Sequence, residues 1–387
     1  MILPRTNRLR NASVWNKELL FIGGFLARAV YESEMQIIRT HWDASVASKN
    51  PDPGLSKGFY EKARHTLRFF TFHTSTPSAI VSGEMRTAFF DCAVQGQPFL
   101  VVSSAGIKSA FDVRMPNPTF SAFLPELPVF PEELLENSGL VVAALQDKGM
   151  LRDISFADVV KELRRRPLSE EETAACLQWW INASQQDPTE IGDNRQRLLD
   201  AAVLIVGSSG GGDKREIPLG GIRTFLNPQR VVVPTDGPLP DHLLPINVNQ
   251  ELNPTQLQQS LQWRELTILE WVQHIVDPVV YTQKSEFNIV ESPIWADRVL
   301  QVLGGCWESL SEVDQTTVIG LLDKLACIPT CAGMKTPSEA YFSEADIFHD
   351  LPVVNLPSGV QIEGNLEGVL ADLGVRKHVD LQVIFDR

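Results

Sequence analysis

The spacing of apolar residues predicts a chain built mainly from helices. In the first 131 residues, large apolar side chains recur every three or four positions, which is the period of one face of an α-helix. This period predicts a long helix from Trp15 to Trp42 with a weak point at Gly23-Gly24, a helix at Tyr60–Phe70, and a helix at Val81–Cys92 opened by Ser78 or Ser82. The short apolar run Pro98–Ser103 predicts a strand, and five prolines between residues 116 and 131 predict a boundary or a rigid wrapping loop.

The middle of the chain, residues 132–245, alternates helical patterns with a predicted hairpin. The predicted helices are Glu132–Gln146, a helix after Ser155 stopped by Pro167, Thr173–Ala183 opened by a capping box at Ser169, and Asn194–Asp200. A predicted strand, Ala201–Val206, a glycine turn at Ser208–Asp213 and a second strand region, Arg215–Phe225, follow. Helices followed by a two-stranded ribbon are the order of a winged-helix domain.

The last part of the chain, residues 246–387, has mainly helical patterns with clear starts. Asn253-Pro254 opens a predicted helix at Thr255–Leu261, and a helical period spans Trp263–Ile275. Ser292-Pro293 starts a predicted helix that runs through Leu303, and Ser311 caps one that runs through Leu325. Asn365 caps the last predicted helix, Leu366–Leu373, which ends before Gly374. After Pro329 the sequence predicts a loop. Apolar residues recur from Val379 to Phe385 without a cap, so we expect the C-terminal edge to be incomplete, as in a chain truncated there.

Together these patterns predict a helix-rich, multidomain α+β fold with a winged-helix-like middle segment. The predicted regions are 1–131, an α+β region, 132–245, winged-helix-like helices with a β-ribbon, and 246–387, which is mainly helical. The 387 residues, 43% apolar and 21% charged, are enough to form substantial cores in two or three domains.

The charge balance narrows the choice of partners. Thirty-four basic and 48 acidic residues give a net charge of -14, which repels phosphate backbones and anionic membranes. Nucleic acid is therefore an unlikely partner, and no apolar stretch is long enough to span a membrane. The five cysteines, an odd number without a secretory leader, indicate reduced thiols in the cytoplasm or the nucleus.

A glycine-rich segment, Gly207–Gly212, is the strongest candidate for a chemical motif. It follows a predicted strand and precedes Lys214, so it resembles a phosphate-binding loop. That loop needs lysine directly after its last glycine, at the start of a helix, whereas here Asp213 intervenes and Pro218 follows within a strand-like run. We expect a turn or flexible wing at this segment, and no nucleotide cofactor.

The cysteines and histidines do not form a recognisable site. Cys327 and Cys331 have the spacing of half a zinc site, but no second pair follows and His349 stands alone. A nucleophile could be built from Cys92 with His65 or His73, although no acidic or amide partner is evident. The interpretation is packed cysteines, with no catalytic, cofactor-binding or metal-binding residue assigned.

Two further clusters have structural explanations. The triplet Arg164–Arg166 could contact phosphates, but residues 151–230 contain 11 basic and 12 acidic residues, so a solvated helix end is the simpler interpretation. Trp179 and Trp180 are core or docking residues, and the sequence does not separate the two.

The amino-acid sequences of several segments resemble those of an uncharacterised fungal family of large proteins. The segments are Trp15–Gly24, Leu67–Ser78, Val233–Pro240, Trp263–Thr267, Pro329–Lys335 and Leu373–Leu381. Those proteins begin with a GHKL-type ATPase domain of the heat-shock-chaperone kind, are sacsin-like, and continue with a long domain of unknown function. The resemblance covers most of this chain and implies that it corresponds to the region after the ATPase domain.

The chain lacks the ATPase motifs that the resemblance would require for activity. A GHKL site needs an acidic residue and an asparagine on one helix, then an Asp-x-Gly-x-Gly turn, and Asp193 is not followed by those glycines. We therefore expect no enzyme activity, and a protein-interaction or scaffold role within a chaperone-like protein, with protein partners or other parts of the same protein. The alternative is a winged-helix module that binds protein or nucleic acid, and an independent hydrolase is the least favoured hypothesis.

Overall fold

The computed structural model describes residues 14–46, 53–70, 72, 78–92, 98–186, 191–207, 215–227, 233–343 and 351–379. The chain divides into two compact units, residues 1–168 and 169–387, and each has its own apolar core. Helices dominate, and every sheet among the described residues has two strands, so the predicted helix-rich α+β class is confirmed. The division into three regions stays a prediction.

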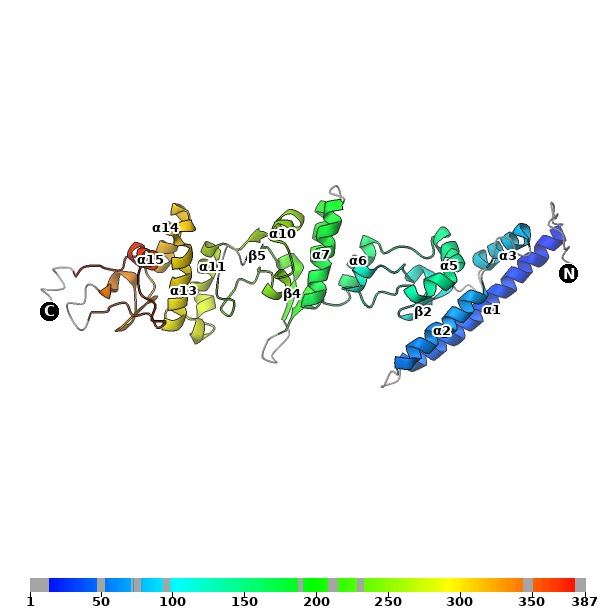
Figure 1. The fold of residues 1–387 in the computed structure, drawn as a ribbon, viewed down its shortest axis with the longest axis horizontal. Coiled ribbons are helices and arrows are strands. Elements are labelled where there is room, and N and C mark those ends of the chain that lie inside the picture. The colour runs from blue at the N-terminus through cyan, green and yellow to red at the C-terminus, as the bar shows by residue number, and fades with distance from the viewer. Residues whose placement is uncertain are drawn as a thin grey trace. The chain divides into compact units, whose positions relative to one another are not determined.

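The first unit combines helices α1, α2 and α3 with a hairpin and further helices that follow it (Figure 1). Its elements are α1 (Val14–Val46), α2 (Pro53–Phe69), α3 (Ala79–Asp91), β1 (Leu100–Ser103), β2 (Gly106–Ser109), η1 (Ala110–Asp112), α4 (Pro118–Ser121), α5 (Glu132–Asp147) and α6 (Phe156–Leu163). Strands β1 and β2 pair antiparallel, with Val101 opposite Lys108. Helix α3 lies along the N-terminal half of α1, and α2 lies along its C-terminal half (Figure 1).

Helix α1 runs without interruption through the predicted weak point. Its 33 residues make it about 50 Å long. Gly24 is buried against α3, where an added Cβ would lie 2.6 Å from both the Ala88 Cβ and the Met85 carbonyl oxygen. The glycine therefore allows close helix packing, and this packing outweighs its low helix propensity.

A buried ion pair joins α1 to the rest of the first unit. Arg28, 2% exposed, donates from Nε to Glu32 Oε1 at 2.7 Å and from Nη1 to the Phe89 carbonyl at 3.1 Å. Glu32 Oε1 also accepts from the Leu100 amide at 3.3 Å. The other oxygen, Oε2, has no hydrogen-bond partner among the described residues. Burial therefore raises the pKa of Glu32, and the charge of Arg28 opposes this shift.

An aromatic cluster surrounds this ion pair. The buried Tyr31 hydroxyl donates to the Leu100 carbonyl at 2.8 Å, and its ring centroid lies 5.0 Å from that of Phe99 and 5.4 Å from that of Phe70. The Arg28 guanidinium lies 4.0 Å from the centroid of Phe99. Rings from three segments thus surround the two charges, and an apolar surrounding strengthens their attraction.

A second ion pair in the first unit joins Arg114 to the first turn of α6. Arg114 contacts Asp158 through two hydrogen bonds of 2.9 and 2.7 Å, and Asp158 completes a capping box with Ser155 at the start of α6. The Arg114 contact lowers the pKa of Asp158 well below its usual range. Because the folded-state pKa is lowered, this pair stabilises the fold above the unfolded pKa, and the contribution is lost as the pH falls.

The second unit contains the remaining elements. They are α7 (Glu170–Gln186), α8 (Ile191–Ala201), β3 (Val203–Val206), β4 (Arg215–Pro218), η3 (Leu219–Gly221), β5 (Thr224–Phe225), α9 (Ile246–Asn249), α10 (Pro254–Leu261), β6 (Arg264–Glu265), α11 (Ile268–Ile275), α12 (Pro278–Tyr281), η4 (Ser285–Phe287), α13 (Pro293–Cys306), η5 (Trp307–Ser309), α14 (Glu312–Leu322), β7 (Ile328–Thr330), β8 (Gly333–Lys335), η6 (Pro337–Glu339) and α15 (Asn365–Leu373).

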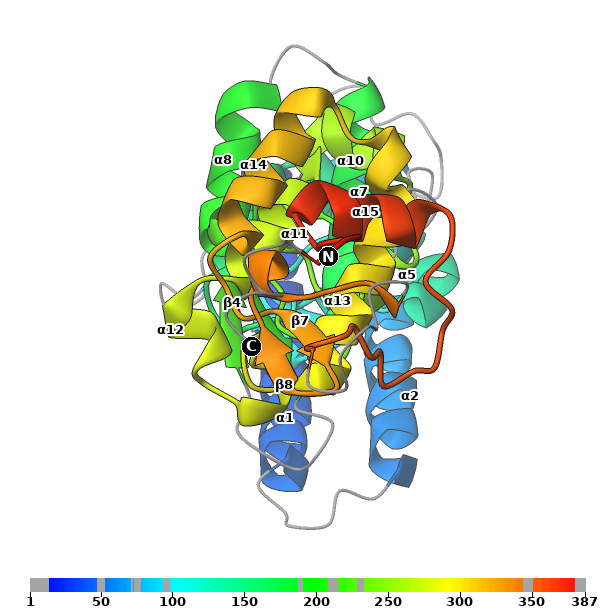
Figure 2. The ribbon, with the colours of Figure 1, turned by 90° about the vertical axis from the view of Figure 1, so that its left-hand side faces the viewer.

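Helix α13 is central to the core of the second unit. It contacts α15 and β7 (Figure 2), and α11 packs against α14. Trp271 of α11 and Trp295 of α13 are completely or almost completely buried, with ring centroids 6.4 Å apart. Elsewhere in this unit, Trp180 of α7 donates to the Ser260 carbonyl of α10 at 3.3 Å. Trp180 is therefore a core residue.

Most predicted helix starts are confirmed by side-chain caps. The capping side chains are Ser78, Ser155, Ser169, Asn253, Ser292 and Ser311. The antiparallel β3–β4 hairpin also occurs where the sequence predicted two strands, with Leu204 opposite Ile217. The second predicted strand region is shorter than expected, because η3 interrupts it after Pro218.

Three predictions in the second unit are corrected. The predicted helix Trp263–Ile275 begins only at Ile268, because Thr267 forms a capping box with Glu270 and the preceding β6 pairs in parallel with β5. The predicted loop after Pro329 contains the β7–β8 hairpin. Gly364, at φ +60°, is the N-cap residue of α15 in place of Asn365, since this left-handed conformation suits glycine.

We predict that Arg28→Met lowers the free energy of unfolding of the first unit by about 3–5 kcal/mol, because it leaves the Glu32 carboxylate buried without a counter-charge. Urea unfolding followed by circular dichroism measures the change. The matched control Arg39→Met, which removes an exposed partner of Asp43 on the same helix, should change stability by less than about 0.5 kcal/mol. Equal effects of the two substitutions would contradict the assigned role of Arg28.

Candidate functional site

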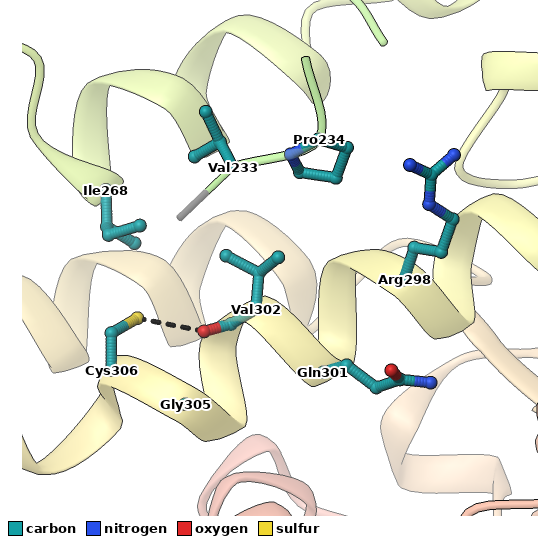
Figure 3. A pocket seen from close by; sticks show the side chains of 8 residues that line it. All are labelled: Val233, Pro234, Ile268, Arg298, Gln301, Val302, Gly305 and Cys306. Carbon is teal, nitrogen blue, oxygen red and sulfur yellow. Dashed lines mark hydrogen bonds between the residues drawn. The ribbon is translucent and has the colours of Figure 1, made fainter. Parts of the chain in front are cut away.

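A pocket of about 450 Å³ lies over α13 in the second unit (Figure 3). It is lined by Val233, Pro234, Ile268, Arg298, Gln301, Val302, Gly305 and Cys306. Successive turns of α13 supply the last five residues, and Ile268 comes from the first turn of α11. Figure 3 shows Arg298 and Gln301 towards one end, and Ile268 and Cys306 towards the other. The pocket therefore has a polar end and an apolar end.

The charge at the polar end is already neutralised. Arg298 donates to both carboxylate oxygens of Asp236, at 2.9 and 2.6 Å, and lies 5.4 Å from the ring centroid of Trp295. These hydrogen bonds lower the pKa of the exposed Asp236 carboxyl. Because both of these hydrogen bonds go to one carboxylate, the Arg298 guanidinium attracts a further anion only weakly. The pocket is therefore a poor candidate for a phosphate-binding site.

Gln301 is also fixed by its neighbours. Its Nε2 donates to Asp297 Oδ1 at 2.8 Å and to Ser358 Oγ at 2.9 Å. Asp297 is buried, and its Oδ2 accepts from the Ser358 amide at 2.7 Å. The buried carboxylate thus holds the loop at Ser358 against α13, which is a structural use of its charge.

Cys306 is a poor candidate for a nucleophile. Its sulfur donates to the Val302 carbonyl at 3.1 Å, and burial raises the pKa of the thiol. The thiolate is the reactive form, so a raised pKa lowers its population at neutral pH. The described lining of the pocket therefore suits the binding of an apolar group better than acid–base or covalent chemistry.

A second pocket, of about 410 Å³, lies in the first unit. It is formed largely by the proline-rich segment that the sequence predicted as a boundary or wrapping loop, with Phe120, Leu124, Leu127 and Phe130 supplying apolar surface. Its lining residues include Ser104, Asn117 and Glu132 as polar groups. Ser104 accepts from the Val129 amide at 3.1 Å, so this hydroxyl already has a partner.

Eight of the fifteen exposed large apolar residues in the described part of the chain belong to α1. Five side chains on the face opposite α3 and α2, Trp15, Ile22, Leu26, Val30 and Ile37, are between 50% and 68% exposed. The buried residues of the same helix, which include Leu20, Tyr31 and Ile38, lie on the other face. A helix that is apolar on both faces is usually enclosed by protein. The sequence already indicated this exposed apolar face, because the apolar residues of the helix occupy more positions than one face can hold.

The other candidate residues that the structure describes lie in α2, at the end of α3 and around the β7–β8 hairpin. Cys92 contacts the Phe89 carbonyl and has a raised pKa because of burial, while His65 is exposed on α2. His73 and His349 lie outside the described residues. Cys327 is buried and Cys331 is exposed in the β7–β8 region. No group of three or more potential metal ligands occurs in the part of the chain that the structure describes.

The basic triplet lies at the end of α6, as predicted. Arg164 follows the last helical residue, Arg165 pairs with Glu162 at 2.7 Å, and Arg166 lies 3.8 Å from Glu126. Acidic neighbours therefore offset two of its three charges. The glycine segment lies outside the described residues from position 208 to 214, and no described helix is long and apolar enough to cross a membrane.

Comparison with known families matches almost the whole chain. Residues 8–387 match the family described as "Protein of unknown function (DUF3684)". The chain belongs to this DUF3684 family. The match spans both compact units, so both are parts of the family's domain. Neither a curated protein nor a solved structure matches the chain.

We predict a strict order of thiol reactivity in this DUF3684 chain. Cys331 is exposed and should react first with Ellman's reagent at pH 8, whereas burial raises the pKa of Cys176 and Cys327 to about 12 and hides both thiols. Those two thiols should react only after denaturation. The substitution Cys331→Ser should remove the fastest phase, and its persistence in that variant would show that another cysteine is the reactive one.

Proposed function

We propose that the chain is a non-catalytic protein-interaction region of a larger, chaperone-like protein that acts in the cytoplasm or the nucleus. The observation that carries this proposal is the exposed apolar face of α1. Its partners are other proteins or other parts of the same protein. The role is that of a scaffold or a relay between domains.

The physical support is the cost of leaving this face in water. Burial of a large aliphatic or aromatic side chain is worth about 1.5–3 kcal/mol. Five such residues on one helix face, each about half exposed, retain several kcal/mol of unused hydrophobic free energy. Contiguous apolar surface of this kind is typical of interaction sites.

The pockets support binding rather than a reaction. In the pocket over α13, Arg298 and Gln301 each have fixed hydrogen-bond partners, and burial raises the pKa of Cys306. These polar groups are directed at neighbouring side chains, whereas catalysis needs fixed donors directed at the place where charge develops on a substrate. An apolar side chain of a partner protein fits this lining.

The chaperone-like context rests on the resemblance to large fungal proteins with a GHKL-type ATPase domain. Membership of the DUF3684 family agrees with a domain of unknown function of that kind. In the proposed arrangement, an ATPase domain elsewhere in the protein supplies the nucleotide chemistry. This region supplies apolar contact surface.

We predict that a photo-reactive benzoylphenylalanine at position 26 forms covalent adducts with protein when the full chain is expressed in its own cells. The side chain of Leu26 points outward, so a bound partner lies within reach of the probe. The adducts should disappear when Val30→Glu is added. The same probe at the exposed position Val313 on α14 is the control. A probe at position 26 that yields only unreacted chain would refute the proposed function.

A winged-helix interaction module is the second candidate function. The observation that favours it is the order of α7, α8 and the antiparallel β3–β4 hairpin. Such a module could bind protein or, with a suitable surface, nucleic acid. The net charge of -14 favours protein.

We predict that duplex DNA binds weakly, because few phosphates can be neutralised, and that added salt weakens this binding further. Fluorescence anisotropy of a labelled duplex measures the affinity at several salt concentrations. Sub-micromolar binding near physiological salt, weakened by neutralising Arg164, Arg165 and Arg166, would instead favour the nucleic-acid function.

A further inference from the structure

We propose that the outward face of α1 pairs with the same face of a second copy of this chain, in an antiparallel, two-fold arrangement centred on Leu26. This inference rests on the proposed function and names the partner. The face is called the α1 seam below and consists of Trp15, Leu19, Ile22, Leu26, Val30 and Ile37, of which Leu19 is half-buried and the others are exposed.

The seam has a regular repeat. Trp15, Leu26 and Ile37 are 11 residues apart, and so are Leu19 and Val30. Eleven residues make slightly more than three full turns of an α-helix, so residues at this spacing stay on one side along the whole helix. A straight seam of about 33 Å results, since 22 residues separate its ends. This length and straightness suit another helix better than a globular surface.

The seam is complementary to itself when one copy is reversed. A two-fold axis at Leu26 places Trp15 beside Ile37 of the second copy, and Ile22 beside its Val30. Leu19 then faces the small Ser33. In a parallel pair, the two Trp15 side chains would instead meet each other at one end. The antiparallel arrangement also brings opposite ends of the two helix dipoles together.

The charges beside the seam permit this arrangement. Between Trp15 and Ile37, the acidic residues that flank the seam are Glu18 on one side and Glu34 on the other. After the two-fold rotation, Glu18 lies near Gln36 and Glu34 lies near Asn16 of the other copy. No like charges are placed opposite each other. A basic flank that would indicate an anionic membrane surface is also lacking along this described part of α1.

The buried area is sufficient for a reversible dimer. The five exposed side chains each contribute on the order of 100 Å² and the half-buried Leu19 contributes less, so pairing removes roughly 500 Å² from each copy. The total of roughly 1,000 Å² is at the lower limit for specific interfaces. We therefore expect dissociation in the micromolar range.

The inner face of α1 is already occupied, which leaves the seam as the available side. Gly24 and Arg28 contact α3, and Glu32 contacts β1. Pairing through the seam needs no rearrangement of these contacts. Substitutions on the seam should therefore change association without unfolding the helix.

Analytical ultracentrifugation of the full chain between about 1 and 100 µM should show a monomer–dimer equilibrium. The double substitution Leu26→Glu and Val30→Glu should raise the dissociation constant at least about 100-fold, since four charges enter the apolar seam of each dimer. The control Val313→Glu, at an exposed apolar position on α14, should leave it unchanged. Circular dichroism checks that each variant keeps its helix content.

A mixing experiment tests the direction of pairing. In a Cys331→Ser background, chains with Glu18→Cys and chains with Gln36→Cys should form cross-linked heterodimers with a short thiol cross-linker, whereas each chain alone should not. Cross-linking of the Glu18→Cys chain with itself would overturn the antiparallel arrangement.

The outcomes separate this inference from the proposed function. A chain that is monomeric at 100 µM, or a dimer that survives the Leu26→Glu and Val30→Glu substitutions, overturns self-pairing. If the photo-probe at position 26 then still captures a different protein, and Val30→Glu abolishes that capture, the proposed function stands without self-pairing. If position 26 captures no protein at all, both fail.

Discussion

The buried ion pair between Arg28 and Glu32 determines how the first unit is built. It connects α1 to residues 61 and 68 positions away, through the Phe89 carbonyl and the Leu100 amide. Hydrophobic burial alone could not orient this helix, because both of its faces are apolar. Sliding α1 by one turn would break the hydrogen bonds of Arg28 and Glu32 to these two groups and leave buried polar atoms unsatisfied, at a cost of a few kcal/mol. The ion pair thus decides which face turns inward and, as a consequence, which face remains exposed.

The two ion pairs of the first unit, one buried and one partly buried, respond to pH in opposite ways. Burial raises the pKa of Glu32, so its contribution favours the folded state at low pH and is lost as the pH rises through the folded-state pKa. The contact with Arg114 lowers the pKa of Asp158, so that contribution is present above the unfolded pKa and is lost on acidification.

Local signals in the sequence were sufficient for most helix starts but not for contacts between distant segments. Ser155 and Asn253 cap helices because the capping oxygen is only two or three residues from the amide it accepts from. The predicted start of α11 was wrong by five residues, because the capping box begins only at Thr267. The residues before it include strand β6, whose partner β5 lies about 40 residues earlier in the sequence. Gly24 was interpreted as a weak point because its neighbour Ala88 is remote in sequence. The α1 seam was visible as a pattern, but which face is exposed follows only from the contacts of Arg28.

The charge of the chain sets the conditions under which the proposed pairing forms. Two copies with a net charge of -14 repel each other at long range, while the seam itself is nearly uncharged. At physiological ionic strength the screening length is about 8 Å, so salt weakens the repulsion and leaves the apolar contact intact. Self-pairing should therefore strengthen as salt is added. Binding to a duplex would weaken under the same conditions, because it depends on attraction between opposite charges. The sign of the salt dependence separates an apolar docking surface from a nucleic-acid surface.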